Sequence, residues 1–292
     1  MKNPTIFIKD KEPALNVDTT NFKLICPKVI KFNDKCYRMY FSQQKKLKNC
    51  YSYYTSIRSA VSKDCNRWLL EEGDRIGLLT DSRFYRMLSP AVIKIDKSLY
   101  RMYFEARTFD NVGVIKSALS YDGIVWKEEP GVRVGKFNKF SYGTPFCFTE
   151  INNQFELFFE RRSKTTRDIW VATSSDGIFF DEKKITPIIK QEKIWESYAI
   201  YSPDISYSNN CYHMYYSGWG GDPVSGHILY AYSYDKKNWK KHEIPVLSPG
   251  ETFDQKHCSE PSLIQVGDKL KIFYEGCDNN KFWRILCAQQ SQ

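Results

Sequence analysis

The sequence predicts an all-β fold, a five-bladed β-propeller whose blades are four-stranded and antiparallel. Three observations predict this fold class: a repeated hairpin, a repeated outer turn and a high aromatic content. Aromatic residues favour strands, and they make up 16% of the 292 residues. Each copy of the hairpin begins at a proline, at Pro27, Pro90, Pro145, Pro203 and Pro261. Repeated units of four strands are typical of propellers. The closed ring of a propeller leaves only short sheet edges.

The inner hairpin of each copy joins two apolar strands through a polar turn. In the second copy SPAVIKI leads through DKS to LYRMYFEAR, and in the fourth SPDISYS leads through SNN to YHMYYSGWG. Short polar turns of this kind typically close hairpins. The predicted inner turns are residues 32–35, 96–98, 151–154, 208–210 and 267–269. The predicted third strands are residues 54–62, 113–120, 168–174, 227–233 and 283–289.

The outer part of copies one to four begins with a Ser-x-Asp turn that leads to an aromatic residue, as in SYDGIVW and SYDKKNW. An Asp side chain in such a turn accepts bonds from the backbone that follows it. We expect the fourth strand to begin at the aromatic residue. Examples are WKEEPGVRV from Trp126 and WKKHEIPVL from Trp239.

The fifth copy stops at CAQQSQ, before a fourth strand. The segment FIKDKEPAL, from Phe7 to Leu15, matches WKKHEIPVL, with a proline six residues after the aromatic residue in both. We therefore predict that the N-terminal strand completes the last blade and closes the ring. Residues 1–292 are predicted to form a single propeller domain.

The amino-acid composition indicates where the protein is located and which classes of partner it binds. No apolar run is long enough to span a membrane, and the start, MKNPTIFIKDKEPALN, lacks the pattern of a signal peptide. Nine scattered cysteines without metal-ligand spacing favour a reducing, cytoplasmic location. The net charge of +9 is spread along the chain, which disfavours nucleic acid and fits either an anionic ligand or ordinary surface charge.

The functional mouth of a propeller lies where its inner strands begin and its second strands end, because these positions share one face near the axis. Five carboxylates are expected there. They are Asp204, Glu260, Glu105, Glu160 and Glu275. Paired carboxyl groups cleave glycosidic bonds when one protonates the leaving oxygen and the other activates water or attacks the sugar. The alternative is that Glu–Arg pairs merely tie blades together.

Basic and aromatic residues accompany these acids. Asp204, Glu260 and Glu160 are the predicted catalytic residues. The predicted substrate-binding residues are Glu105, Arg107, Arg161, Glu275, Arg86, Tyr142, Tyr198, Tyr201 and His257. Charged donors and aromatic faces of this kind hold a sugar ring. His257 is a candidate to tune the acid, bind an anion or hold a cation. The expected partner is a carbohydrate or a sugar phosphate.

The repeated blade pattern, including the phrases YRMYFEAR and SYDGIVW, resembles that of the five-bladed propeller glycosidases. These are the arabinanase/β-xylosidase family (glycoside hydrolase family 43-like), the invertase family and the mannoside phosphorylase family. The resemblance implies that YSPDI around Asp204 is the strand of an acid-tuning Asp. It also implies that CSEPSLI around Glu260 is the strand of the general acid.

One blade departs from that pattern. The blade before Asp204 should begin with a base Asp, but it reads SYGTPFC, and the Trp-Met-Asn-Asp-Pro phrase of the invertases is absent from the sequence. Three explanations stay open: Glu160 serves as the base, phosphate replaces water as the nucleophile, or the site binds a sugar without catalysis. A protein-interaction scaffold is a further alternative. No cofactor or metal is expected, although a cation or phosphate in the channel stays open.

Overall fold

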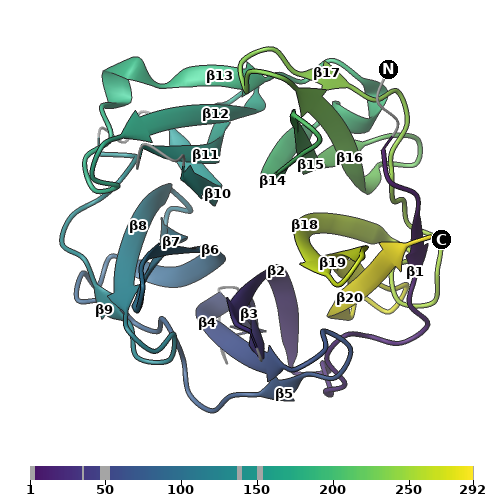
Figure 1. The fold of residues 1–292 in the computed structure, drawn as a ribbon, viewed down its shortest axis with the longest axis horizontal. Helices are drawn as coiled ribbons and strands as arrows, with labels where there is room; N and C mark the ends of the chain where they lie inside the picture. Colours follow the sequence, from purple (N-terminus) through teal and green to yellow (C-terminus); the bar gives the residue numbers. More distant parts are fainter. Residues whose placement is uncertain (1–3, 35, 47–52, 137–139, 150–153, 292) are drawn as a thin grey trace.

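The protein is a ring of five blades around a central axis (Figure 1). This is a computed structural model, and it describes residues 4–34, 36–46, 53–136, 140–149 and 154–291. Strands dominate it, joined by turns and two short 3-10 helices, Glu182–Lys184 and Ile194–Glu196. The predicted all-β propeller is therefore confirmed. The inner turn predicted at 151–154 lies almost wholly outside the described residues.

Each blade is an antiparallel sheet whose first strand lies innermost (Figure 1). Blade 1 consists of β2 (Phe22–Asn33), β3 (Cys36–Lys46), β4 (Tyr53–Ser62) and β5 (Leu69–Leu70). Blade 2 consists of β6 (Phe84–Asp96), β7 (Leu99–Thr108), β8 (Gly113–Ser120) and β9 (Lys127–Glu128). Blade 3 consists of β10 (Ser141–Thr149), β11 (Phe155–Arg162), β12 (Arg167–Ser174) and β13 (Thr186–Ile189). Blade 4 consists of β14 (Ala199–Ser208), β15 (Cys211–Gly220), β16 (Ser225–Ser233) and β17 (Lys240–Lys241).

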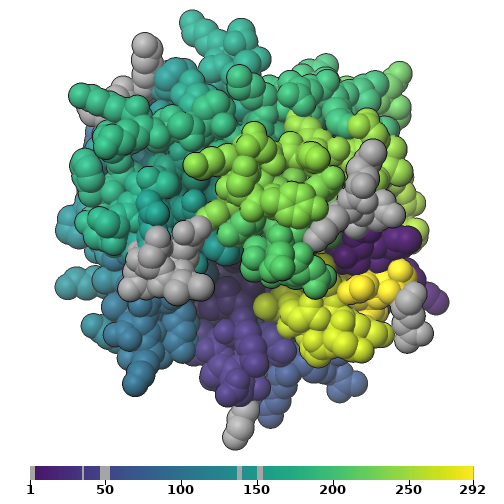
Figure 2. All heavy atoms as spheres, turned by 45° about the horizontal axis from the view of Figure 1, so that its top comes forward, coloured from purple at the N-terminus to yellow at the C-terminus, as the bar shows by residue number. Residues whose placement is uncertain are grey.

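Blade 5 joins the two ends of the chain, as predicted. It consists of β18 (His257–Val266), β19 (Lys269–Cys277), β20 (Trp283–Gln290) and the N-terminal β1 (Phe7–Lys9). Strand β1 pairs antiparallel with β20, with Phe7 opposite Gln290. Figure 2 shows the same contact as purple N-terminal atoms against yellow C-terminal atoms. The ring is thus closed by hydrogen bonds between residues far apart in the sequence.

The outer strands are shorter than predicted. Strand β9 covers two residues, and the chain returns to β8 only at an isolated bridge between Ile115 and Val134. Blade 4 repeats this arrangement with a bridge between Ile228 and Leu247. A proline lies between the two contacts in both blades, and proline cannot donate a hydrogen bond to a neighbouring strand.

The predicted Ser-x-Asp turns are confirmed, and they also join neighbouring blades. The Asp122 carboxylate accepts bonds from the Ile124 and Val125 amides, at 2.8 and 2.9 Å. The backbone carbonyl of Asp122 in turn accepts a bond from Arg38 of blade 1, at 2.9 Å. Arg101 of blade 2 makes the equivalent bond to the turn of blade 3.

The hydrophobic core lies between the blades. Each of five buried clusters in the described residues combines side chains of two adjacent blades. The cluster between blades 2 and 3, for example, packs Tyr103 and Ile115 against Phe159 and Tyr142.

The inner strand of every blade contains a bulge that the sequence analysis did not predict. Its pairing with the second strand shifts at the proline. The residue before each proline has a positive φ between 45° and 58°, a conformation that is uncommon outside glycine. These residues are Cys26, Ser89, Thr144, Ser202 and Glu260. The bulge turns five backbone amides toward the neighbouring blades.

Candidate active site

A ring of hydrogen bonds joins these bulges at the mouth of the channel, the end where the inner strands begin. The amide before the proline donates to a side chain of the preceding blade. The bonds are Cys26 to Glu275 (3.1 Å), Ser89 to Ser42 (3.1 Å), Thr144 to Glu105 (3.2 Å), Ser202 to Thr144 (3.0 Å) and Glu260 to Ser217 (2.7 Å). Four of the five acceptors are side chains near the ends of second strands, and the fifth, Thr144, lies on the inner strand of blade 3.

A cavity of about 130 Å³ lies within this ring, and we call it the mouth cavity. Seven of the predicted site residues line it: Glu105, Glu160, Glu260, Glu275, Arg86, Arg107 and Tyr201. Residues that were not among the predicted site residues line it too: Cys26, Ser89, Thr144, Arg162 and Arg167. The carboxylates of blades 2, 3 and 5 thus meet at one cavity.

Glu105 is a fully buried carboxylate held by two arginines. It forms ion pairs with Arg107 and with Arg162, the latter at 2.8 Å, and it caps the Thr144 amide. Burial raises the pKa of Glu105, but the two guanidinium groups lower it further, to well below its usual range. Glu105 therefore keeps its negative charge, and its oxygens are occupied by protein donors.

Glu160, at the same position of blade 3, is also fully buried between two arginines. Arg162 reaches one of its oxygens at 2.7 Å, and Arg167 reaches the other at 2.6 Å. Arg162 bridges Glu160 and Glu105, so a Glu–Arg–Glu–Arg chain runs along one wall of the cavity. Buried pairs of this kind are held strongly, because removing one member leaves an uncompensated charge.

Glu260 and Glu275 form a pair of buried carboxyl groups without an arginine. Burial raises the pKa of Glu260 well above its usual range, and the adjacent Glu275 raises it further. Burial also raises the pKa of Glu275 to about 7, although the Ser259 hydroxyl and the Cys26 amide lower it. The Cys26 thiol completes this group, and all three lie within 4.8 Å of one another through one donor atom each.

Besides holding protons, these three groups offer one ligand atom each to a cation. Both oxygens of Glu275 already accept bonds from the protein, from Ser259 at 2.7 Å and from Cys26 at 3.1 Å. A metal ligand must be deprotonated. Burial instead raises the pKa of the Cys26 thiol well above its usual range.

The arginines give the cavity a positive bias. Arg86, Arg107, Arg162 and Arg167 line it together with four glutamates. When Glu260 holds a proton, four guanidinium groups face three carboxylates. Arginine is well suited to oxyanions, because its planar donors match carboxylate and phosphate oxygens in pairs. The cavity can therefore hold an anion.

Tyr201 lines the mouth cavity and contacts His257 behind it. Tyr201 is buried in the mouth cavity, and its hydroxyl lies 3.4 Å from the Nε2 atom of His257. The Nδ1 atom of His257 accepts a bond from the Gly226 amide, at 3.0 Å. Burial lowers the pKa of His257 to about 4, and His227 lowers it further. His257 is thus a neutral residue that orients Tyr201 rather than one that lines the cavity.

Three other predicted binding residues lie away from the mouth cavity. Arg161 stacks over the rings of Phe140 and Trp170, at 4.0 and 3.6 Å. Tyr142 is buried in the core between blades 2 and 3. Tyr198 is 56% exposed and packs on Trp219, outside the cavity lining. Arg162 takes the place expected for Arg161, because alternate residues of a strand face the same side and Arg162 follows Glu160 by two.

Asp204 is also displaced from its predicted place. It lines a separate cavity of about 300 Å³, formed by the inner strands farther from the mouth. There it forms a buried ion pair with Lys28, whose ammonium group lies over the Phe146 ring at 4.4 Å. The bulge causes the displacement: it breaks the strand alternation, so Asp204, two residues after the bulge residue, faces the second cavity.

Gly143, in the SYGTPFC phrase of blade 3, lies directly against the ion pair of Glu105 and Arg162. A Cβ atom at Gly143 would collide with the Glu105 carboxylate and the Arg162 guanidinium. The phrase SYGTPFC therefore leaves room for an ion pair contributed by blades 2 and 3. The acidic function of this wall comes from the second strands instead of the inner strand.

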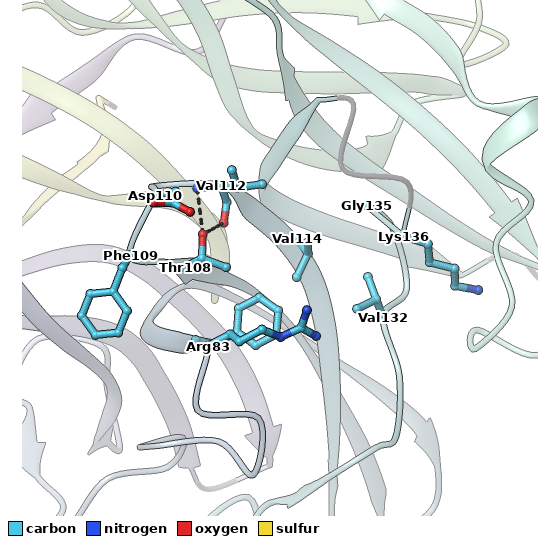
Figure 3. Close-up of a pocket in the computed structure, with 10 residues that line it drawn as sticks. Arg83, Thr108, Phe109, Asp110, Val112, Val114, Val132, Gly135 and Lys136 are labelled. Atoms are coloured by element: carbon cyan, nitrogen blue, oxygen red, sulfur yellow. Dashed lines mark hydrogen bonds between the residues drawn. The ribbon is translucent and has the colours of Figure 1, made fainter.

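A further cavity, of about 420 Å³, lies on blade 2 (Figure 3). Arg83 and Lys136 flank it, and Val114 and Val132 line its apolar side. Among the described residues that line it, Asp110 supplies the one carboxyl group. An acid and a partner carboxylate meet at the mouth cavity and not here, so we take the mouth cavity as the candidate active site.

Comparison with known proteins gives one curated relative. A stretch of 104 residues is 36% identical to the beta-1,2-mannobiose phosphorylase of Thermoanaerobacter sp. (strain X514). The match covers 34% of this chain and about a third of the relative's length. No protein-family model matches the chain.

Solved structures resemble the whole chain. A glycoside hydrolase superposes with a TM-score of 0.85 at 14% identity, covering 99% of this chain and 93% of that one. A structure from the GH130 family of mannoside phosphorylases, which contains glycoside hydrolases that target β-1,2 mannosidic linkages in Candida mannan, gives a TM-score of 0.78 at 12% identity. It covers 98% of this chain and 93% of its own. The resemblance to the propeller glycosidases is thus confirmed at the level of the fold.

Proposed function

We propose that the protein cleaves a glycosidic bond at the mouth cavity, with Glu260 as the proton donor and phosphate as the acceptor of the sugar. The observation that carries this proposal is the contrast among the carboxyl groups of the cavity. Glu260 has the raised pKa that a general acid needs near neutral pH, because burial and Glu275 disfavour its charged form. The other cavity carboxylates are engaged by protein donors.

The choice of phosphate as the acceptor of the sugar follows from the ion pairs and hydrogen bonds of the other carboxylates. A base that activates water needs an oxygen free to take its proton. Both oxygens of Glu105 and of Glu160 are held by arginines, and both oxygens of Glu275 accept protein hydrogen bonds. Phosphate is already an anion and needs no base, and arginines bind it. Arg86 supports such a role, since its Nε atom is buried without a partner among the described residues.

The reaction balances with these groups alone. The Glu260 proton goes to the glycosidic oxygen as the bond from that oxygen to the anomeric carbon breaks. A phosphate oxygen forms the new bond to the anomeric carbon, giving a sugar phosphate and a saccharide with a free hydroxyl group. Glu260 then recovers a proton from solvent. The curated relative is a phosphorylase, which supports the assignment.

Hydrolysis with Glu160 as the base is the second candidate, because one of the neighbouring structures is a glycoside hydrolase. Hydrolysis requires Arg162 or Arg167 to release a Glu160 oxygen when the substrate binds. The non-catalytic reading, a propeller that binds a sugar or another protein, requires neither release nor proton transfer.

We also propose a cytoplasmic location. Each of the eight cysteines that the structure describes is a free thiol, which fits a reducing compartment. No helix among the described residues is long and apolar enough to cross a membrane.

The test is a turnover screen. Purified protein is incubated with oligosaccharides, aryl glycosides and sugar phosphates, with and without phosphate, and products are identified by mass spectrometry. We expect a phosphate-dependent sugar phosphate that Glu260→Gln loses by at least about 100-fold and the exposed control Glu243→Gln retains. Turnover without phosphate would establish hydrolysis instead. Sugar binding without turnover would overturn the enzymatic proposal.

A further inference from the structure

The Glu260 and Glu275 carboxyl groups are buried neighbours in the mouth cavity. An oxygen of each lies within 4.8 Å of an oxygen of the other. Two buried carboxyl groups this close disfavour each other's charged form, so at least one of them has a raised pKa.

Hydrogen bonds indicate which of the two carboxyl groups holds a proton. Glu275 accepts from the Ser259 hydroxyl at 2.7 Å and from the Cys26 amide at 3.1 Å, and bonds of this kind favour the charged form. The Glu260 carboxyl group faces the mouth cavity, where a hydrogen bond from Ser202 lowers its pKa by less than burial and Glu275 raise it. The negative charge therefore belongs on Glu275 and the proton on Glu260.

We propose that Glu275 is the positioning residue that keeps Glu260 protonated, the role that the resemblance assigned to Asp204. This inference rests on the proposed function, because it names the group that prepares the acid of that reaction. Asp204 cannot serve from its place in the second cavity, where Lys28 neutralises it. Glu275 reaches Glu260 because both belong to blade 5, on neighbouring strands β19 and β18.

The remaining charged groups around the pair support the same direction. Glu160 and Glu105 face Glu260 from blades 3 and 2 and add negative potential. Lys23 of β2 is the cation that acts on Glu275. The other titratable groups packed around the pair are Cys26 and Tyr201, while His257 is neutral. Three of the cavity's arginines, Arg107, Arg162 and Arg167, are bound to Glu105 and Glu160 on the other wall, whereas Arg86 is bound to neither.

The pH dependence of kcat/KM in Glu275→Gln tests this role. The basic limb of the profile reports the loss of the acid proton in the free enzyme. Removing the Glu275 charge is expected to move that limb to lower pH by about 1–2 units, by the size of the Coulomb term at this separation. Activity at the acidic end should remain, because the amide oxygen can still accept from Cys26 or Ser259. Glu243→Gln, on the surface, should leave the profile unchanged.

A second readout is independent of turnover. The infrared carbonyl band of a protonated carboxyl group is followed from pH 5 to pH 9 in the wild type, Glu260→Gln and Glu275→Gln. We expect a band that persists at pH 8 in the wild type, is lost in Glu260→Gln, and disappears at lower pH in Glu275→Gln. An unshifted band and basic limb in Glu275→Gln would overturn the role of Glu275. If no glycan is turned over but the band behaves as expected, the proposed function fails and the proton pair stands.

Discussion

Glu105 in blade 2 and Glu275 in blade 5 occupy the same position of the repeated unit, yet their electrostatic surroundings are opposite. Each ends its second strand, is buried, and caps the bulge amide of the next blade. Two arginines hold the pKa of Glu105 well below its usual range despite burial, whereas burial without an arginine raises that of Glu275 to about 7. These two glutamates therefore share the capping bond but not the charge.

The difference has a local origin in the sequence. Two residues after the glutamate stands Arg107 in blade 2, but Cys277 in blade 5. Alternate residues of a strand face the same side, so this neighbour meets the carboxylate directly. Buried ion pairs connect blades 2 and 3, which have the Glu-x-Arg pattern. Blade 5 lacks the pattern, so its carboxyl group can remain protonated. Glu105 and Glu160, with their arginines, thus form a structural wall of the mouth cavity. Glu260 and Glu275 form the opposite wall, which we propose to be the reactive one.

The largest predicted effect comes from breaking the arginine wall. Arg162→Met should destabilise the protein by about 3–5 kcal/mol, because it removes the guanidinium that Glu105 and Glu160 share and leaves each of these buried carboxylates with one arginine. Urea denaturation measures this loss. Arg161→Met, one residue earlier, is the matched control: its guanidinium stacks on two rings and has no carboxylate in the ring of caps, so it should cost about 1 kcal/mol. Equal losses would contradict the comparison.

The next effect is a pH dependence of stability with opposite sign for the two glutamates. The raised pKa of Glu275 means that the stability it contributes is present below about pH 4.5 and lost as pH rises toward 7. Glu275→Gln removes that loss, so its stability relative to the wild type should improve between pH 5 and pH 8 by about 1–3 kcal/mol.

Glu105→Gln should behave in the reverse way. The lowered pKa of Glu105 contributes stability above its unfolded value that is lost as the pH falls. This variant should therefore be most destabilised at neutral pH and approach the wild type in acid. Denaturation midpoints for both variants across this range test the pair. Parallel pH profiles would show that the two sites do not differ.

The smallest predicted effect concerns one hydrogen bond, which the Ser259 hydroxyl donates to Glu275. Ser259→Ala removes a hydroxyl donor from Glu275, at a cost of about 1 kcal/mol measured by denaturation. It should also raise the pKa of Glu275, because that donor favours the charged form. Ser217→Ala is the control, since it uncaps the Glu260 amide without touching either carboxyl group. An unchanged Glu275 titration in Ser259→Ala would contradict this account of the pair.

Much of the fold could be predicted because the hairpins, turns and closing strand carry strong local patterns. The site was harder for two reasons. The bulges are formed by residue types that do not signal a positive φ, among them Ser202 just before Pro203, so the displacement of Asp204 could not be foreseen. Arg162, by contrast, could have been chosen over Arg161 from strand alternation alone. Contacts such as Glu260 with Glu275 depend on side-chain packing that no spacing reveals.

The most direct test of the central claim is a carboxyl ¹³C NMR titration of protein labelled at its glutamate side chains. Glu105→Gln and Glu275→Gln assign the two signals. The Glu105 signal is expected to stay at its ionised position through the acidic range in which the protein remains folded, while the Glu275 signal moves near pH 7. A Glu275 signal that is fully ionised by pH 5 would contradict the contrast, because the two equivalent glutamates would then have the same charge state over the same pH range.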